Sequence, residues 1–168
     1  KLTGETVKVT RACEPFDKIT MSGGLDIKYI EDDSCYVEIE ADKALNAKVS
    51  TEVTDGILNI ALLQTSFDGN IFDKDDKAQD DRTFTFHGMK NAIDKTLDDD
   101  IKVIVHAPYL NEIQSHGAID FEAYKVKSQG EFYLRVSGKS DIKIKRLESR
   151  QVELSTSGLS DIEVGIYN

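Results

Sequence analysis

The sequence predicts an all-β protein built of stacked parallel strands, a β-solenoid with rungs of about 20 residues. Three observations predict it. A short turn motif recurs, its last three copies are 21 and then 20 residues apart, and apolar and polar residues alternate beside each copy. This period is too short for a βαβ unit, which takes roughly 30 residues. It accommodates two or three short strands with their turns, so almost no helix is expected.

In each of the four motif copies a Gly is followed three residues later by an Asp and then by an apolar residue. The Gly permits a turn with positive φ, and the Asp carboxylate can accept hydrogen bonds from the amides of the turn. Stacking would align equivalent residues at one corner. The eight residues to which we assign this structural turn role are Gly23, Asp26, Gly117, Asp120, Gly138, Asp141, Gly158 and Asp161.

The chain between the first two copies lacks the motif. Residues 36–63 read as antiparallel or meandering strands, with Asp55-Gly56 as a hairpin turn, and 101–105 as a further strand. The segment 64–100 contains ten Asp against five Lys or Arg and is expected to be an acidic excursion. We therefore expect one domain, 1–168, with an inserted hairpin and acidic segment.

Composition narrows the partners. The net charge of -10 and the pI of about 4.8 argue against nucleic acid or an anionic membrane surface. No apolar stretch approaches the roughly 20 residues that span a bilayer, so no membrane insertion is expected. The chain begins at Lys1 without an apolar leader, as expected of a protein whose targeting signal has been removed. Cys13 and Cys35 are too few for a metal cage, and either one disulfide or two small buried thiols fits them.

No metal site or cofactor is expected. With a 20-residue period, stacked Asp side chains would lie one strand spacing apart, about 4.8 Å, which favours a turn role over a calcium ladder. The acidic run 73–80 has Lys77 and Ala78 where a calcium loop needs an oxygen ligand and Gly. The three histidines, which follow no metal-ligand spacing, are His87, His106 and His116.

No catalytic residues are assigned, since neither a nucleophile elbow nor a phosphate-binding loop occurs. The alternative to a noncatalytic module is a β-helix polysaccharide-active enzyme, a lyase or hydrolase that uses acidic residues. A lyase would need a basic residue, for which Arg135, Arg146 and Arg150 are the candidates within the repeats.

The run from Phe16 to Ile27, the strand Tyr36 to Glu40 and the run Asp55 to Ile60 resemble, in order, the auto-transporter adhesin head (GIN) domains of Bacteroidetes-type bacteria. The repeated Ser-Gly-x-x-Asp-Ile is similar to that family's Ser-Gly-Ser-Gly-Asp. The resemblance implies a right-handed parallel β-helix exported to the periplasm, outer membrane or cell surface. It implies an adhesin-like, noncatalytic binding or structural role.

The sequence also departs from the family pattern. The last three copies lack the second Gly, with Ala118, Ser140 and Ser160 standing beside the Asp instead. The sequence ends at Tyr167-Asn168, soon after the fourth copy, which predicts an open end of the stack. Strand edges exposed there would allow a homo-oligomer to form. The other partners expected are a carbohydrate or an envelope protein.

Overall fold

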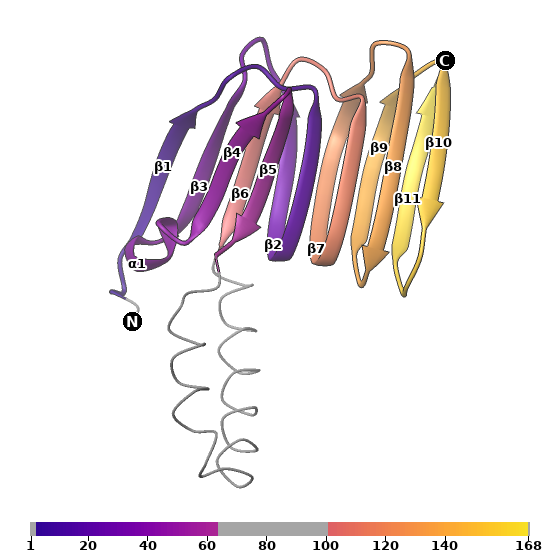
Figure 1. Ribbon diagram of the computed structural model, residues 1–168. Coiled ribbons are helices and arrows are strands. Elements are labelled where there is room, and N and C mark those ends of the chain that lie inside the picture. Colours follow the sequence, from indigo (N-terminus) through magenta and orange to yellow (C-terminus); the bar gives the residue numbers. More distant parts are fainter. Residues whose placement is uncertain (1–2, 64–100, 168) are drawn as a thin grey trace, which may run out of the picture.

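The computed structural model describes residues 3–63 and 101–167 (Figure 1). One short helix, α1 (Lys43–Asn46), accompanies eleven strands in this part of the chain. The strands are β1 (Thr6–Ala12), β2 (Lys18–Glu31), β3 (Tyr36–Asp42), β4 (Val49–Thr54), β5 (Ile57–Leu62), β6 (Lys102–Ala107), β7 (Glu112–Lys127), β8 (Glu131–Gly138), β9 (Asp141–Glu148), β10 (Gln151–Thr156) and β11 (Asp161–Tyr167). None of the described helical residues forms a segment long and apolar enough to cross a membrane.

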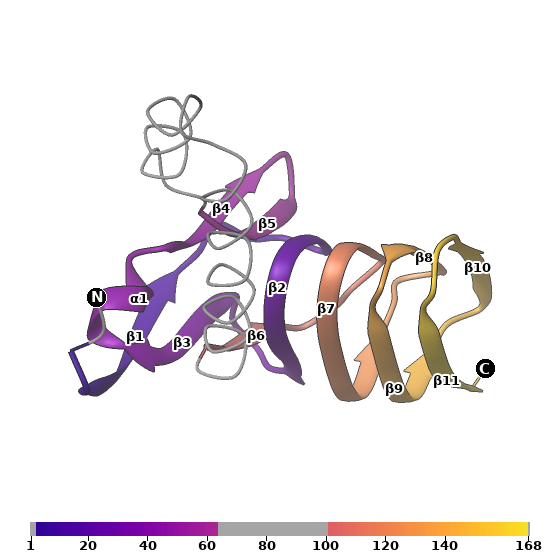
Figure 2. The ribbon, with the colours of Figure 1, turned by 90° about the horizontal axis from the view of Figure 1, so that it is seen from below.

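All eleven strands belong to one sheet, and the long strands β2 and β7 fold it into two limbs. The first halves of β2 and β7 form one limb with β4, β5, β8 and β10. Their second halves form the other limb with β1, β3, β6, β9 and β11. The first half of β2 pairs with β5 and its second half with β6, while β7 runs beside both halves. In the same way, β7 pairs first with β8 and then with β9. In Figure 2 these two strands curve as broad bands between the antiparallel strands and the C-terminal strands. The two limbs meet along a line that we call the fold line. It passes Gly23 of β2 and Gly117 of β7, which both have positive φ.

The predicted right-handed parallel β-helix is wrong. The strands form a mixed, open sheet in which β1–β3, β3–β6 and β4–β5 are antiparallel, with β1 and β10 at the ends of the main strand order. Strand β2 pairs parallel with β7. Parallel pairs in the repeat spacing connect β7 with β8 and β9, β8 with β10, and β9 with β11. The short turn between β4 and β5 imposes antiparallel pairing on these two strands. Strand β3 pairs antiparallel with β1 and β6, which are distant in sequence, and in this arrangement it buries Val37, Ile39 and Ala41 in the core.

The predicted Asp55-Gly56 hairpin turn is confirmed by the antiparallel pairing of β4 with β5. Asp55 and Gly56 have φ of 54° and 78°, and two positive values are those of the type I′ turn that suits the twist of a hairpin. The hairpin is part of the main sheet, because β5 pairs parallel with β2. The acidic segment 64–100 lies outside the described residues.

The core lies between the two limbs. It is lined by alternate residues of the strands, and its largest fully buried side chains include Tyr29, Phe121 and Phe132. Apolar residues at alternate positions of the strands are mostly buried, but Leu154 on β10 is 52% exposed. Leu154 aligns with the buried Leu134 of β8. It is exposed because β10 is the last strand of its limb and no described strand covers it.

Candidate functional site

A groove of about 840 Å³ lies on the outward side of β2, β7, β9 and β11. One row of charged side chains crosses all four strands. The parallel registers align Lys28 with Glu122, Glu122 with Lys143, and Lys143 with Glu163. Successive side chains of a strand point to opposite faces, and the neighbours of these charged residues point inward. The charged residues therefore point outward.

A second row contains the aromatic residue of the groove, Tyr124, whose side chain is 70% exposed. Lys145 Nζ lies 5.6 Å from the centroid of the Tyr124 ring, within the range of a cation–π contact. The groove is hollowed beside this pair by Gly165, at an irregularity in the register of β11. A Cβ at Gly165 would come 2.5 Å from the carbonyl oxygen of Lys145, so only glycine allows this approach.

The four motif glycines lie above one another along the fold line. Gly23 aligns with Gly117, and Gly117 with Gly138. Their φ values lie between 84° and 104°. A Cβ on Gly138 would lie 2.7 Å from the backbone nitrogen of Gly117, and one on Gly158 2.5 Å from the carbonyl oxygen of Gly138. Both the left-handed backbone and the close stacking therefore require glycine.

The four motif aspartates are also in register, from Asp26 through Asp120 and Asp141 to Asp161. The last three are exposed, and their carboxylates make no hydrogen bond within the described residues. Hydroxyl groups contact the backbone at this corner instead. The buried Ser140 donates to the carbonyl of Gly117 at 2.9 Å, and Ser160 donates to the carbonyl of Gly138 at 3.2 Å. The structural role assigned to the eight motif residues stays a prediction.

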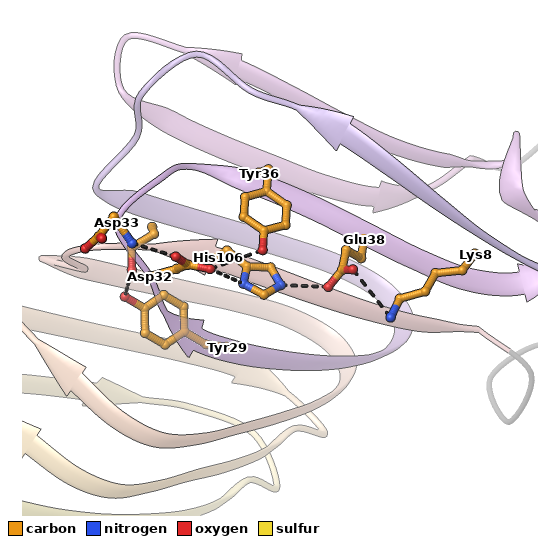
Figure 3. Close-up of polar contacts among 8 residues, drawn as sticks. Lys8, Tyr29, Asp32, Asp33, Tyr36, Glu38 and His106 are labelled. Carbon is orange, nitrogen blue, oxygen red and sulfur yellow. Dashed lines mark hydrogen bonds and ion pairs between the residues drawn. The ribbon is translucent and has the colours of Figure 1, made fainter.

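A polar cluster that sequence reasoning missed surrounds His106 on β6 (Figure 3). The side chain is buried, and both ring nitrogens contact carboxylates. Nδ1 lies 3.1 Å from Asp32 Oδ2 and Nε2 lies 2.7 Å from Glu38 Oε1. The ring stacks on Tyr36 with centroids 4.0 Å apart. Each ring nitrogen thus faces one carboxylate oxygen, so the ring lies between two acceptors.

Both carboxyl groups of the cluster titrate below their usual range. The hydrogen bond from His106, supported by Lys8 at 3.4 Å, lowers the pKa of Glu38. The backbone N–H of Asp33 and the hydroxyl of Tyr36 lower the pKa of Asp32, to which His106 also contributes. Because both ring nitrogens are occupied, His106 has no free position for proton transfer. The cluster ties the turn after β2 and the strand β3 to β6. Sequence spacing gave no signal for it, since its members lie 68 and 74 residues apart.

No group of three or more metal-ligating side chains occurs within residues 3–63 and 101–167. The arginines considered for lyase chemistry do not gather: Arg135 is exposed on β8, while Arg146 bonds Glu148 and lies over the ring of Tyr167. Arg150 follows β9, and a Cβ on Gly130 would approach its guanidinium.

The apolar side chains at the C-terminal edge of the sheet include the exposed Leu159 and Ile166. Assembly through this edge stays a prediction.

Comparison with solved structures shows similarity of fold. A putative adhesin from Parabacteroides distasonis matches with 18% identity and a TM-score of 0.53, over 98% of this chain and 68% of that one. A putative lipid binding protein from the same organism matches with 19% identity and a TM-score of 0.50 over the same shares. A putative cell adhesion protein from Clostridium sporogenes matches with 10% identity and a TM-score of 0.51, over 97% of this chain and all of that one.

No curated protein matches the chain. The family model described as "Putative auto-transporter adhesin, head GIN domain" matches residues 15–165. This match confirms the resemblance inferred from the turn motif and the order of the strands. The family is adhesin-like, which implies the cell surface or envelope as its location. Since the match covers most of the sequence, the chain belongs to the auto-transporter adhesin head (GIN) domain family.

Proposed function

We propose that this chain is a noncatalytic binding module of the bacterial cell envelope, and that the groove over β2, β7, β9 and β11 binds carbohydrate. The observation that carries the proposal is Tyr124, a large aromatic residue that is 70% exposed and lines this groove of about 840 Å³. An exposed aromatic ring in a concave surface indicates a ligand-binding site, because such sites combine aromatic side chains with a few polar groups.

The chemistry of the groove fits a sugar. The C–H face of a pyranose ring can lie on the Tyr124 ring, while its hydroxyl groups both donate and accept hydrogen bonds. The row of charges supplies both kinds of partner: Lys28 and Lys143 donate, and Glu122 and Glu163 accept. With Lys145, the groove is lined by three lysines and two glutamates, which give it a formal charge of +1. A charge this close to zero favours neutral or weakly charged sugars over strongly anionic polymers.

The geometry also favours binding over hydrolysis. A glycosidase needs one carboxyl group that stays protonated at neutral pH, and burial in an apolar pocket supplies that condition. Glu122 and Glu163 are both exposed, and Lys143 stands between them in the register. Neither glutamate lies in the apolar pocket that a general acid requires, so the arrangement supports ligand binding rather than hydrolysis. Membership of an adhesin-like family supports the same role.

The test is a glycan array followed by calorimetric titration of the best neutral oligosaccharide. We expect Tyr124→Ala to weaken binding by roughly tenfold or more, which corresponds to about 1.4 kcal/mol. The matched control is Tyr109→Ala, which removes an exposed tyrosine from outside the groove and should leave affinity unchanged. Equal affinity of the two variants, or no glycan bound by the unmodified chain, would contradict the proposal. Measured turnover of a polysaccharide would contradict its noncatalytic part.

A further inference from the structure

The two cysteines of the chain lie beside each other at one end of the antiparallel pair β1–β3. We propose that Cys13 and Cys35 form a disulfide that closes this end of the sheet. The register of the pair ends with Ala12 opposite Tyr36. Continuing it by one residue on each strand places Cys13 opposite Cys35.

The two side chains also lie on the same face. Along β1 the half-buried residues Val7 and Val9 face the buried Ala41 and Ile39 of β3. Cys13 and Cys35 continue this inward-facing alternation, and both pack against the hydrophobic core. Directly opposed residues of antiparallel strands have Cα atoms about 4.5 to 5.5 Å apart, which lies within the range of about 4.4 to 6.8 Å that a disulfide bridges.

The local contacts agree with this pairing. The Cys35 thiol lies 3.8 Å from the carbonyl oxygen of Phe16, so it already contacts the segment that follows Cys13. Burial, and next the neighbouring Cys35, raise the pKa of Cys13, which places the two sulfur atoms within electrostatic range of each other. Each side chain is half-buried, so a redox partner can still reach it.

The bond would join two parts of the N-terminal end of the sheet. Strand β1 pairs with β3 alone in the described sheet and therefore forms an edge. The turn that ends at Cys35 carries Asp32, one of the two carboxylates on His106. A bond across this end would fix the edge strand and the turn together. The oxidising compartments outside the cytoplasm are those in which such bonds persist.

The oxidation balances with a disulfide as oxidant, either on a protein or as oxidised glutathione. One cysteine, as its thiolate, attacks a sulfur of that disulfide and releases the other sulfur as a thiolate. The second cysteine then attacks the mixed disulfide, forms the Cys13–Cys35 bond and releases the remaining sulfur. Two protons and two electrons leave the protein, and the oxidant becomes a pair of thiols.

The test uses the full chain exposed to oxidised glutathione at pH 8. We expect a mass lower by two hydrogens, loss of both titratable thiols, and a monomer on a nonreducing gel. A reductant should then lower Tm by roughly 6–12 °C, the shift anticipated for opening a loop of about 20 residues in a protein of this size. Mass analysis of the peptides should link Cys13 to Cys35.

The double variant Cys13→Ala/Cys35→Ala is the control for packing. Its Tm should match that of the reduced chain and should not respond to reductant. Two free thiols that persist in the oxidised sample would overturn the proposal, and so would a link between two chains or a Tm that reductant leaves unchanged. None of these readouts depends on carbohydrate binding, so this inference and the proposed function can fail separately.

Discussion

The two ends of the sheet hold their strands in register by different means. On the C-terminal side, β7, β8, β9, β10 and β11 pair in parallel, and a column of glycines fixes how closely they stack. On the N-terminal side, β1, β3 and β6 pair antiparallel and have no repeated motif. There the polar side chains of distant residues hold the strands: His106 contacts Asp32 and Glu38. A repeated motif thus sets register locally, while a region without it depends on specific long-range contacts.

Long-range polar contacts also hold the helix α1 and the edge strand β1 on the N-terminal side. Asp42, at the end of β3, accepts hydrogen bonds from the backbone of Thr3, Gly4 and Ala44. Arg11 reaches from β1 to the carbonyl oxygens of Asn46 and Val49, at 2.8 and 2.6 Å. These contacts join the edge strand to the segment between β3 and β4. If the comparison is right, substitutions on the two sides should differ in the kind of damage and in its response to pH.

The largest effect is expected from Phe121→Ala, in the middle of the stacked strands. Phe121 is fully buried, and truncation of such a side chain leaves a cavity that lowers the free energy of unfolding by about 3–5 kcal/mol. Chemical denaturation measures this change. The matched substitution Leu154→Ala, at the exposed edge strand, should cost less than about 1 kcal/mol. Similar losses for both would show that the edge is covered in solution.

The second effect is expected from Gly138→Ala. The new Cβ would strain a positive φ of 86° and overlap the backbone of Gly117, which together should cost about 3 kcal/mol. Gly4 has a similar φ of 82° with nothing within 4 Å of an added Cβ. Gly4→Ala should therefore show the conformational cost alone, about 1 kcal/mol. Equal thermal shifts for the two variants would remove close stacking from the explanation.

A third, smaller effect should appear in the pH dependence of the N-terminal side. The lowered pKa values of Asp32 and Glu38 give stability that is fully present above about pH 4.5 and is lost as the pH falls through their folded-state values. His106→Gln should lower Tm at pH 7 and flatten its dependence on pH between 5 and 3, because Glu38 loses the hydrogen bond that most lowers its pKa and Asp32 loses a smaller contribution. His116→Gln, on the exposed corner of β7, should retain the unmodified profile.

The smallest effect is expected from Asp42→Asn, which keeps a capping side chain. Burial opposes ionisation, but the backbone N–H groups of Thr3, Ala44 and Gly4 lower the pKa of Asp42 to about 2. Its contribution to stability should be complete above about pH 4 and disappear as the pH falls towards 2. The variant should lose a little Tm at neutral pH and converge with the unmodified chain near pH 2. Divergence at low pH would assign the effect to packing.

Local patterns in the sequence predicted much of the fold. Alternation predicted the strands that became β3, β5 and β6, and the Asp-Gly pair predicted the β4–β5 turn. The recurring motif predicted which strands stack in parallel near Gly117 and Gly138. It did not predict the whole architecture, because the motif is absent between its first two copies. There β3 pairs antiparallel with β1 and β6, which are distant in sequence, and the sheet is mixed instead of the expected β-helix.

The candidate site was less predictable than the fold. Tyr124 and Lys145 are ordinary alternating residues in sequence, and they form a groove only because β7 and β9 lie side by side in one register. Cys13 and Cys35 were visible as a pair in the sequence. Only the register of β1 with β3, continued by one residue, brings them opposite each other, and the disulfide between them is our proposal.

By itself, the sequence determined the class of the protein, the strands with one buried face and the glycine positions, because alternation and backbone freedom act over a few residues. The tertiary structure decided the pairing of distant strands, the placement of His106 between Asp32 and Glu38, and the outward groove around Tyr124. These depend on contacts between residues far apart in the chain. Such contacts form only when burial of the whole core compensates the entropy lost on bringing distant segments together.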